Sequence, residues 1–264
     1  MTGVLAFIGR NTLELVRYGS GLYDLTKETA YWTFVAPFKG RGLKWGGAIH
    51  QMVLAGVNSI PIVCLISFFV GLIISLQGAY ELKRFGATYF VTALVGVSIT
   101  RELGPLITAI VIAGRSGSAF AAELGTMKVS EEIDALEAMG LDSIKYLVVP
   151  KYLAMLVMMP CLTTLSDVSG ILGGGFFETF QLGQSFKIFI LATRDALEMH
   201  DIWTGLIKSL VFGVIITKVG CYEGLSVRGG AEGVGKATTS SVVVSIFLII
   251  LADVLFTALF YYTT

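Results

Sequence analysis

Charged residues, histidine and cysteine are all scarce in this sequence of 264 residues. Asp, Glu, Lys and Arg make up 14% of it, where soluble domains have about a quarter, and 55% is hydrophobic, which excludes an ordinary soluble domain. The 19 basic and 19 acidic residues cancel, so nothing favours a nucleic-acid partner. The two histidines, His50 and His200, belong to no Ser/His/Asp or Cys/His arrangement and no paired carboxylates support hydrolysis, so we expect no catalytic residues.

The cysteines and the one glycine-rich loop motif also argue against a metal site and against nucleotide binding. Cys64, Cys161 and Cys221 lie far apart in apolar stretches without metal-ligand spacing, so we expect no metal site. Residues 230–237, GAEGVGKA, nearly match a phosphate-binding P-loop, but Ala237 stands where Ser or Thr must reach magnesium, and no strand precedes the loop. We therefore predict that the chain has no ATPase motif of its own, binds no cofactor and is not itself an enzyme.

What the sequence does have is five long apolar stretches bounded by polar loops. They cover residues 49–79, 87–113, 147–177, 202–220 and 238–262. About 20 apolar residues cross a hydrocarbon core of about 30 Å, so each stretch is a candidate transmembrane helix, although the fourth is short and interrupted by Lys208. Small residues, dense at 170–175, favour close packing of these helices. We predict an all-α integral membrane protein with five transmembrane helices, folded as a single membrane domain over residues 1–264.

The basic residues lie mainly on one side of the predicted membrane. Residues 1–48 hold six of them, 114–151 four and 218–236 three, while the opposite side has Lys83, Arg84, Lys187 and Arg194. Because cytoplasmic loops carry the excess of Lys and Arg, we expect the N-terminus in the cytoplasm and the C-terminus on the outer side.

The segment before the first span, residues 1–48, has the pattern of an interfacial helix. Apolar residues near helical spacing are interrupted by Arg10, Glu14 and Arg17, which suits an amphipathic helix in the plane of the interface. The apolar positions are Val4, Leu5, Ile8, Leu15 and Val16. A basic cluster, Lys39, Arg41 and Lys44, then suits anionic headgroups. We expect an elbow that leads into the membrane.

Every span after the first carries ionisable residues. They are Arg101 and Glu102, then Asp167, Lys208 and Asp253. A charge near the bilayer centre costs about 2.5–3.5 kcal/mol, so these side chains should face protein, water or a polar ligand. Lys208 can pair with Asp253 or Glu102, or meet a lipid phosphate, and Arg101 can do either; the sequence leaves these alternatives open.

The polar interruption between the second and third spans, residues 114–146, carries helix signals of its own. Ser130 suits an N-cap, Glu131 and Glu132 the first turn, and Gly140 the C-terminal exit. Ile133, Leu136 and Met139 gather on one side of this helix and Glu131, Asp134 and Glu137 on the other. Residues 113–119, AGRSGSA, are expected to form a small-residue turn at the membrane exit. The helix is either a docking element for a soluble partner or a solvated loop helix.

Several segments together resemble the MlaE-type permeases. They are residues 100–105 (TRELGP), 113–119 (AGRSGSA), 122–127 (AELGTM) and 235–239 (GKATT), in order over most of the chain. One departure is that Glu137-Ala138-Met139 runs directly into Gly140, where ABC importers more broadly have Glu-Ala-Ala with a later Gly. The detailed contacts of those importers are therefore not transferred.

The resemblance implies the permease subunit of an ABC transporter that moves phospholipid between the inner membrane and the cell envelope. It implies a homodimer in the inner membrane, a separate cytoplasmic ATPase that binds ATP and magnesium, a periplasmic MCE-domain protein and a small cytoplasmic accessory subunit. By this analogy the helix at 131–139 is the coupling helix for the ATPase, between spans 1–2 (49–113) and spans 3–5 (147–262). Two alternatives stay open: an ion-coupled secondary transporter and a non-transporting membrane scaffold.

Overall fold

The chain is a bundle of long helices, described by a computed structural model that covers residues 16, 18–35, 45–181, 183 and 185–263. This described part contains no strand. Five helices are long and apolar enough to cross a membrane: Trp45–Arg84, Thr88–Val129, Ile144–Gln181, Met199–Leu225 and Gly230–Phe260. The predicted all-α membrane fold with five spans is confirmed.

Each of the first three spans is a run of helical pieces joined without a break. Span 1 contains α2 (Trp45–Gln51), η3 (Met52–Gly56), η4 (Val57–Ser59) and α3 (Ile60–Arg84). Span 2 contains η5 (Thr88–Phe90), α4 (Val91–Ser98), η6 (Ile99–Leu103), α5 (Gly104–Ile112), η7 (Ala113–Gly117) and α6 (Ser118–Val129). Span 3 contains η8 (Ile144–Val148) and α8 (Val149–Gln181).

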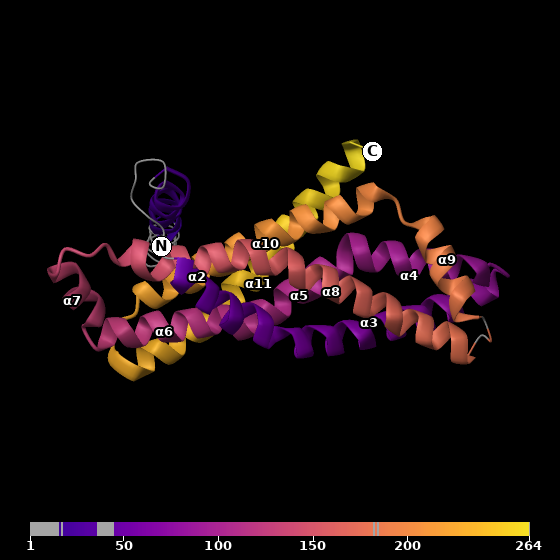
Figure 1. Cartoon of the computed structure of the whole chain (residues 1–264), viewed down its shortest axis with the longest axis horizontal. Helices are drawn as coiled ribbons and strands as arrows, with labels where there is room; N and C mark the ends of the chain where they lie inside the picture. The colour runs from indigo at the N-terminus through magenta and orange to yellow at the C-terminus, as the bar shows by residue number, and fades with distance from the viewer. Residues whose placement is uncertain (1–15, 17, 36–44, 182, 184, 264) are drawn as a thin grey trace, which may run out of the picture.

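The remaining elements are two long helices and three shorter ones. Spans 4 and 5 are α10 (Met199–Leu225) and α11 (Gly230–Thr263). Before span 1, residues 18–30 are helical and run into η1 (Tyr31–Val35). The short helices α7 (Glu132–Ala138) and α9 (Phe186–Ala196) lie at opposite ends of the long axis, and the end of α11 diverges from the bundle (Figure 1).

Glycines bring spans 1 and 3 into backbone contact. A Cβ on Gly71 would lie 1.9 Å from the Gly170 carbonyl oxygen, and one on Gly173 would lie 2.0 Å from the Phe68 carbonyl oxygen. The Ser67 and Ser166 hydroxyls form a hydrogen bond of 2.6 Å across the same contact. The close packing predicted for residues 170–175 is confirmed, since only residues without a side chain fit there.

The main apolar core contains residues of all five spans. Ile112, Leu124, Met155, Phe212 and Ile216 are all fully buried in it. In contrast, the most apolar stretch of span 5 is 11% buried and that of span 1 is 28% buried, against 50–56% for the other three. Spans 1 and 5 therefore leave large apolar faces uncovered by this chain.

The structure corrects two expectations about the segment after span 2. The turn expected at residues 113–119 is wrong, because the helix continues through η7 and α6 to Val129. Its small residues serve packing instead: Ser116 Oγ donates to the Ala55 carbonyl oxygen at 3.1 Å, and Gly117 faces Ile216. The N-cap expected at Ser130 is also wrong, since Ser130 ends α6 and Glu131, at φ +61°, precedes α7.

The predicted elbow lies mostly outside the described residues, and one helix of the structure was not predicted. Of the predicted elbow residues, Val4 to Leu15, Arg17 and the Lys39, Arg41 and Lys44 cluster lie outside the described residues. Helix α9 was not predicted; Phe189 and Thr193 are its buried face, packed toward α4 and α8. The loop that holds α9 was expected only to carry Lys187 and Arg194.

Candidate functional site

The intramembrane charges meet around Lys208. This side chain is fully buried on α10, and its Nζ pairs with Glu102 of η6 and lies 2.9 Å from Asp253 Oδ1 of α11. It also donates a hydrogen bond of 2.8 Å to Thr257 Oγ1, one turn further along α11. These contacts join spans 2, 4 and 5. We call the four residues involved the Lys208 cluster: Lys208, Glu102, Asp253 and Thr257. The Lys208 charge is balanced by protein groups, as a buried charge requires.

The backbone around Glu102 explains how α10 comes close enough for this pairing. Residues 99–103 form a π-helical turn, a local widening that often marks functional sites, and Pro105 in the first turn of α5 needs no amide partner. A Cβ on Gly205 would lie 2.3 Å from the Thr100 carbonyl oxygen, so glycine is required at this contact. Lys208 follows Gly205 by about one turn and therefore reaches Glu102.

Arg101 points to a different partner. Its guanidinium lies 3.8 Å from the Asp201 carboxylate at the start of α10, and the two side chains are 27% and 9% exposed. Asp201 also accepts a hydrogen bond from the Glu198 amide at 3.2 Å, as part of a capping box that begins α10. The Arg101–Glu102 pair therefore contacts the same helix at two points, through Asp201 and through Lys208.

Asp167 is not part of the Lys208 cluster. It lies on α8 against the start of α5, where a Cβ on Gly104 would be 1.7 Å from Asp167 Oδ1. That oxygen is buried and has no hydrogen-bond partner among the described residues. Asp167 and Gly104 thus form a separate close contact between spans 2 and 3.

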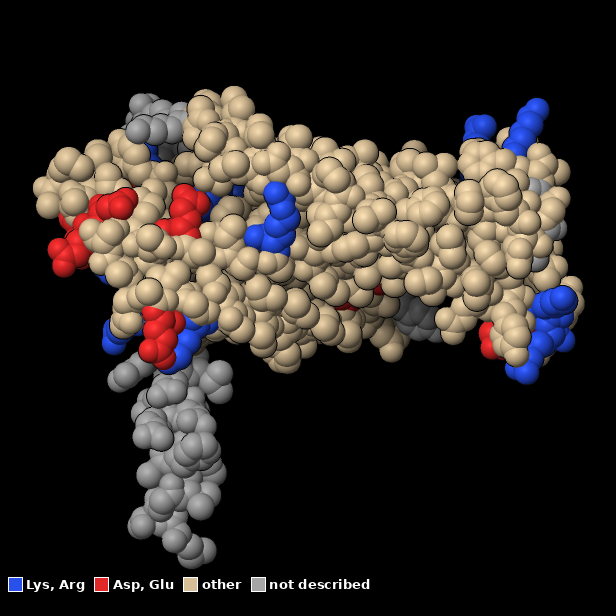
Figure 2. Space-filling model, turned by 90° about the horizontal axis from the view of Figure 1, so that it is seen from below, with Lys and Arg blue, Asp and Glu red and all other residues tan. Residues whose placement is uncertain are grey.

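The acidic helix α7 lies at one end of the molecule, and Figure 2 shows acidic side chains gathered at that end. Ile133 is buried, whereas Met139 is 67% exposed. Lys128 Nζ lies 2.6 Å from Asp134 Oδ1, and Ser143 donates to Glu137 at 2.8 Å. Leu136 is half-buried, and Glu131 and Glu132 are exposed.

The end of α7 has the geometry predicted for it. Gly140 has φ +74°, and its amide donates to the Glu137 carbonyl oxygen at 2.9 Å. The next amide, of Leu141, donates to the Leu136 carbonyl oxygen at 3.1 Å. These two hydrogen bonds form a Schellman motif, so the exit at Gly140 is confirmed.

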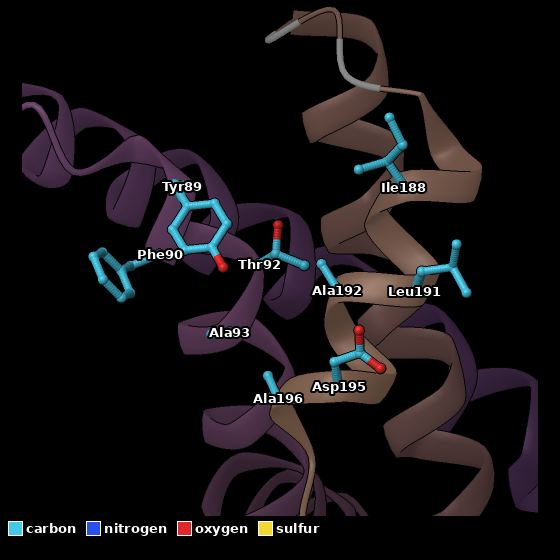
Figure 3. Close-up of a pocket in the computed structure, with 9 residues that line it drawn as sticks. All are labelled: Tyr89, Phe90, Thr92, Ala93, Ile188, Leu191, Ala192, Asp195 and Ala196. Carbon is cyan, nitrogen blue, oxygen red and sulfur yellow. The ribbon is translucent and has the colours of Figure 1, made fainter.

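A cavity of about 410 Å³ lies at the opposite end, between α4 and α9. Its walls are mainly apolar, with Phe90 and Ala93 on one side and Ile188 and Leu191 on the other. Figure 3 shows the Tyr89 hydroxyl and the Asp195 carboxylate coming from opposite helices. The cavity therefore combines apolar walls with few polar groups, which suits an amphipathic ligand or segment.

With this geometry in view, comparison with known proteins identifies the family. The family described as Permease MlaE matches residues 48–259, which include all five spans almost completely.

The chain belongs to the MlaE permease family.

Relatives of this MlaE-family permease match it over most of their length. A probable ABC transporter permease protein of Rickettsia bellii is 39% identical over 254 residues, 96% of each chain. A probable ABC transporter permease protein of Synechocystis is 43% identical over 205 residues, 78% of each chain. The chloroplastic protein TRIGALACTOSYLDIACYLGLYCEROL 1 of Arabidopsis thaliana is 39% identical over 223 residues, 84% of this chain and 63% of that one. The protein is thus a multi-pass ABC transporter permease, a class that works with an ATPase.

Sequence reasoning about this permease missed several polar partners. Asp201 and Thr257 complete the contacts of Arg101 and Lys208. Glu178, 1% exposed, accepts a hydrogen bond of 2.6 Å from Thr92, and is a further buried carboxylate near the end of span 3. The spacing of Glu198 and Asp201 ahead of an apolar stretch is a capping-box signal that could have located the start of α10. Thr257 gave no signal, because its pairing depends on packing between distant segments.

Proposed function

We propose that this MlaE-family permease is the membrane subunit of an ABC transporter that moves phospholipid between the inner membrane and the cell envelope. A separate cytoplasmic ATPase supplies the energy and binds ATP and magnesium. The observation that carries the mechanism is the unbroken helix from Thr88 to Val129. It holds Arg101 and Glu102 along its length and leads at its end directly into α7. A displacement of α7 therefore reaches the Lys208 cluster through one continuous helix.

In this proposal α7 is the docking element for the ATPase. Its Glu131, Glu132 and Met139 side chains are exposed, while Ile133 anchors it to the protein. Burial, followed by the neighbouring carboxylates of Asp142, Asp24 and Glu137, raises the pKa of Glu28, which indicates an acidic surface around α7. A groove with basic walls on the ATPase would be complementary to it.

The uncovered apolar faces are consistent with partners in and across the membrane. Span 5 exposes Phe247, Val254 and Leu255, and a second copy packed on this face would enclose a lipid cavity beside Asp253. The outer end, with α9 and the cavity beside it, would meet a periplasmic MCE-domain protein, and a small accessory subunit would join the ATPase. This requires the N-terminus in the cytoplasm and the C-terminus in the periplasm. The name of the Arabidopsis relative refers to a diacylglycerol lipid, which supports a glycerolipid cargo.

The role proposed for the Lys208 cluster is mechanical. Lys208 is fully buried and joins three spans, so moving α10 away from η6 must break or exchange a buried ion pair. Removing one partner of such a pair costs about 3–5 kcal/mol. The cost of leaving a buried charge unpaired would hold the lipid cavity in one state until ATP-driven motion arrives.

The test of the docking assignment is charge reversal on α7. The variant Glu131→Lys, Asp134→Lys and Glu137→Lys should retain the membrane fold but lose the ATPase on purification and lose lipid-linked ATP turnover. Glu81→Lys and Glu232→Lys, in exposed ion pairs elsewhere, are matched controls and should behave as wild type. Retention of the ATPase and normal turnover in the α7 variant would contradict the assignment.

A further inference from the structure

A second cavity lies between spans 1 and 2, toward the α7 end. Its volume is about 260 Å³. Gln51, Leu54 and Asn58, spaced by three or four residues, form the wall on span 1, and Arg115 and Phe120 lie on the wall from span 2. Arg115 belongs to the segment 113–119, whose small residues pack the helices together and whose arginine has no role in the Lys208 cluster.

A hydrogen bond holds Arg115 in position but occupies only part of its N–H donors. Its guanidinium donates a hydrogen bond to Ser59 Oγ, and Ser59 donates in turn to the Ala55 carbonyl oxygen at 2.7 Å. Among the described residues, the Arg115 guanidinium forms no ion pair and no further hydrogen bond. A guanidinium has five N–H donors, so most of them remain for a ligand in the cavity.

The charges around the cavity leave a positive excess. Glu123, at the far end of the lining, accepts a hydrogen bond of 2.8 Å from Lys151, whose side chain is 2% exposed. The charges of Glu123 and Lys151 cancel, so the positive charge of Arg115 remains as the net charge at the cavity. A bidentate anion such as phosphate matches a fixed guanidinium in charge and in geometry. The amides of Asn58 and Gln51 add neutral donors to the same cavity.

The position along the helix places Arg115 at headgroup depth. Tyr89 and Phe90, exposed aromatic residues typical of a membrane interface, begin span 2 at the opposite end. At 1.5 Å per residue, Arg115 lies about 39 Å further along the helix, close to the 40–45 Å thickness of a bilayer with its headgroups. Next to the cavity, Val53, Leu54 and Val57 are exposed apolar residues of span 1, along which acyl chains can lie.

We propose that this cavity binds the phosphate of a phospholipid from the leaflet on the α7 side, with Arg115 as the anion ligand. Leu54 and Phe120 contact the glycerol and upper acyl region, and Asn58 donates to the headgroup. This inference rests on the proposed function. If the protein transports phospholipid, the cavity is the point at which the transported lipid meets this leaflet. The binding itself does not depend on ATP.

The test is native mass spectrometry of the complex, purified, stripped of lipid and titrated with phosphatidylglycerol or with inorganic phosphate. Arg115→Gln should weaken phosphatidylglycerol binding about tenfold, the loss expected for one charged hydrogen-bonding group, and Arg115→Lys should weaken it less. Arg84→Gln, which removes an exposed arginine at the other end, is the matched control and should leave binding unchanged. Equal phosphatidylglycerol binding by Arg115→Gln and wild type would overturn the proposal, as would saturable inorganic phosphate binding without lipid binding.

Two more variants keep the result independent of folding. Ser59→Ala removes the internal partner of Arg115 and should retain lipid binding within about twofold, whereas Ala119→Phe fills the cavity and should abolish it without touching the charge. Lipid binding that survives Ala119→Phe would overturn the proposal. Loss of the ATPase from Arg115→Gln with lipid binding intact would also overturn it, since the cavity would then face a protein. ATP-driven transfer absent from wild type, with Arg115-dependent binding present, would contradict the proposed function alone.

Discussion

Lys208 depends entirely on its neighbours, because its side chain has no exposed surface. Lys208→Met would leave Glu102 and Asp253 as uncompensated carboxylates between three spans. We expect a loss of about 3–5 kcal/mol of stability, the range for breaking a buried ion pair, seen as a lower apparent Tm of the purified permease. Lys187→Met, at an exposed position of α9, is the matched control and should not change Tm.

The same position gives a compensation test. Lys208→Met combined with Glu102→Gln and Asp253→Asn should recover much of the lost Tm, because no unpaired charge remains in the membrane. An unchanged Tm for Lys208→Met alone would contradict the account of the cluster.

Gly71 tests the backbone contact between spans 1 and 3. Gly71→Ala places a Cβ within 1.9 Å of a carbonyl oxygen of α8, so the helices must separate and the fold should lose about 1–3 kcal/mol, as in overpacked cores. Gly235→Ala on α11 has open space around it and should be neutral or stabilising, since Ala favours helix over Gly. Equal thermal stability of the two variants would show that the contact is not tight.

At the scale of whole elements, α7 owes its position to three fixed points. Ile133 is buried beneath it, the Lys128–Asp134 pair ties it to α6, and the Schellman motif at Gly140 fixes its exit. Ile133→Asp removes the anchor and should release the ATPase from the complex while the five spans stay folded. Proteolysis between residues 129 and 144 should then become faster than in wild type. Unchanged ATPase retention and cleavage would argue against an anchored docking element.

The spans could be predicted from the sequence and their details could not. A bilayer demands about 20 apolar residues in a row, so five such stretches define five helices. The continuation of span 2 to Val129 was missed because glycine and serine at 113–119 serve either a turn or close helix packing, and only the neighbouring Ala55 and Ile216 decide between them. Helix α9 was missed because its 11 residues are too few to cross a bilayer, so the length criterion that identifies the spans does not identify it.

The charged residues of the candidate site could be predicted from the sequence, but which side chains pair with one another could not. Because a charge is costly inside a membrane, the sequence alone indicates Lys208, Glu102 and Asp253 as residues that need polar partners. The choice of Asp201 for Arg101, and the addition of Thr257, depend on how α10 and α11 rotate against η6, which no local pattern encodes.

At the scale of the whole molecule, the uncovered face of span 5 requires a partner or lipid. Val254→Trp on this face should dissociate the proposed homodimer, because a large side chain cannot enter a closely packed helix interface. Leu172→Trp, on an exposed part of α8, is the matched control and should leave the dimer intact. The measurement is subunit stoichiometry by native mass spectrometry. A dimer that survives Val254→Trp would place the interface elsewhere.

ATP-dependent phospholipid transfer is the most direct measurement of the central claim. The purified complex in vesicles, supplied with fluorescent phospholipid and an acceptor membrane, should transfer lipid with ATP and not with a non-hydrolysable analogue, and the α7 charge-reversal variant should transfer none. Transfer at the same rate without ATP hydrolysis would indicate a secondary transporter, and full ATP turnover with neither bound nor transferred lipid would contradict the account.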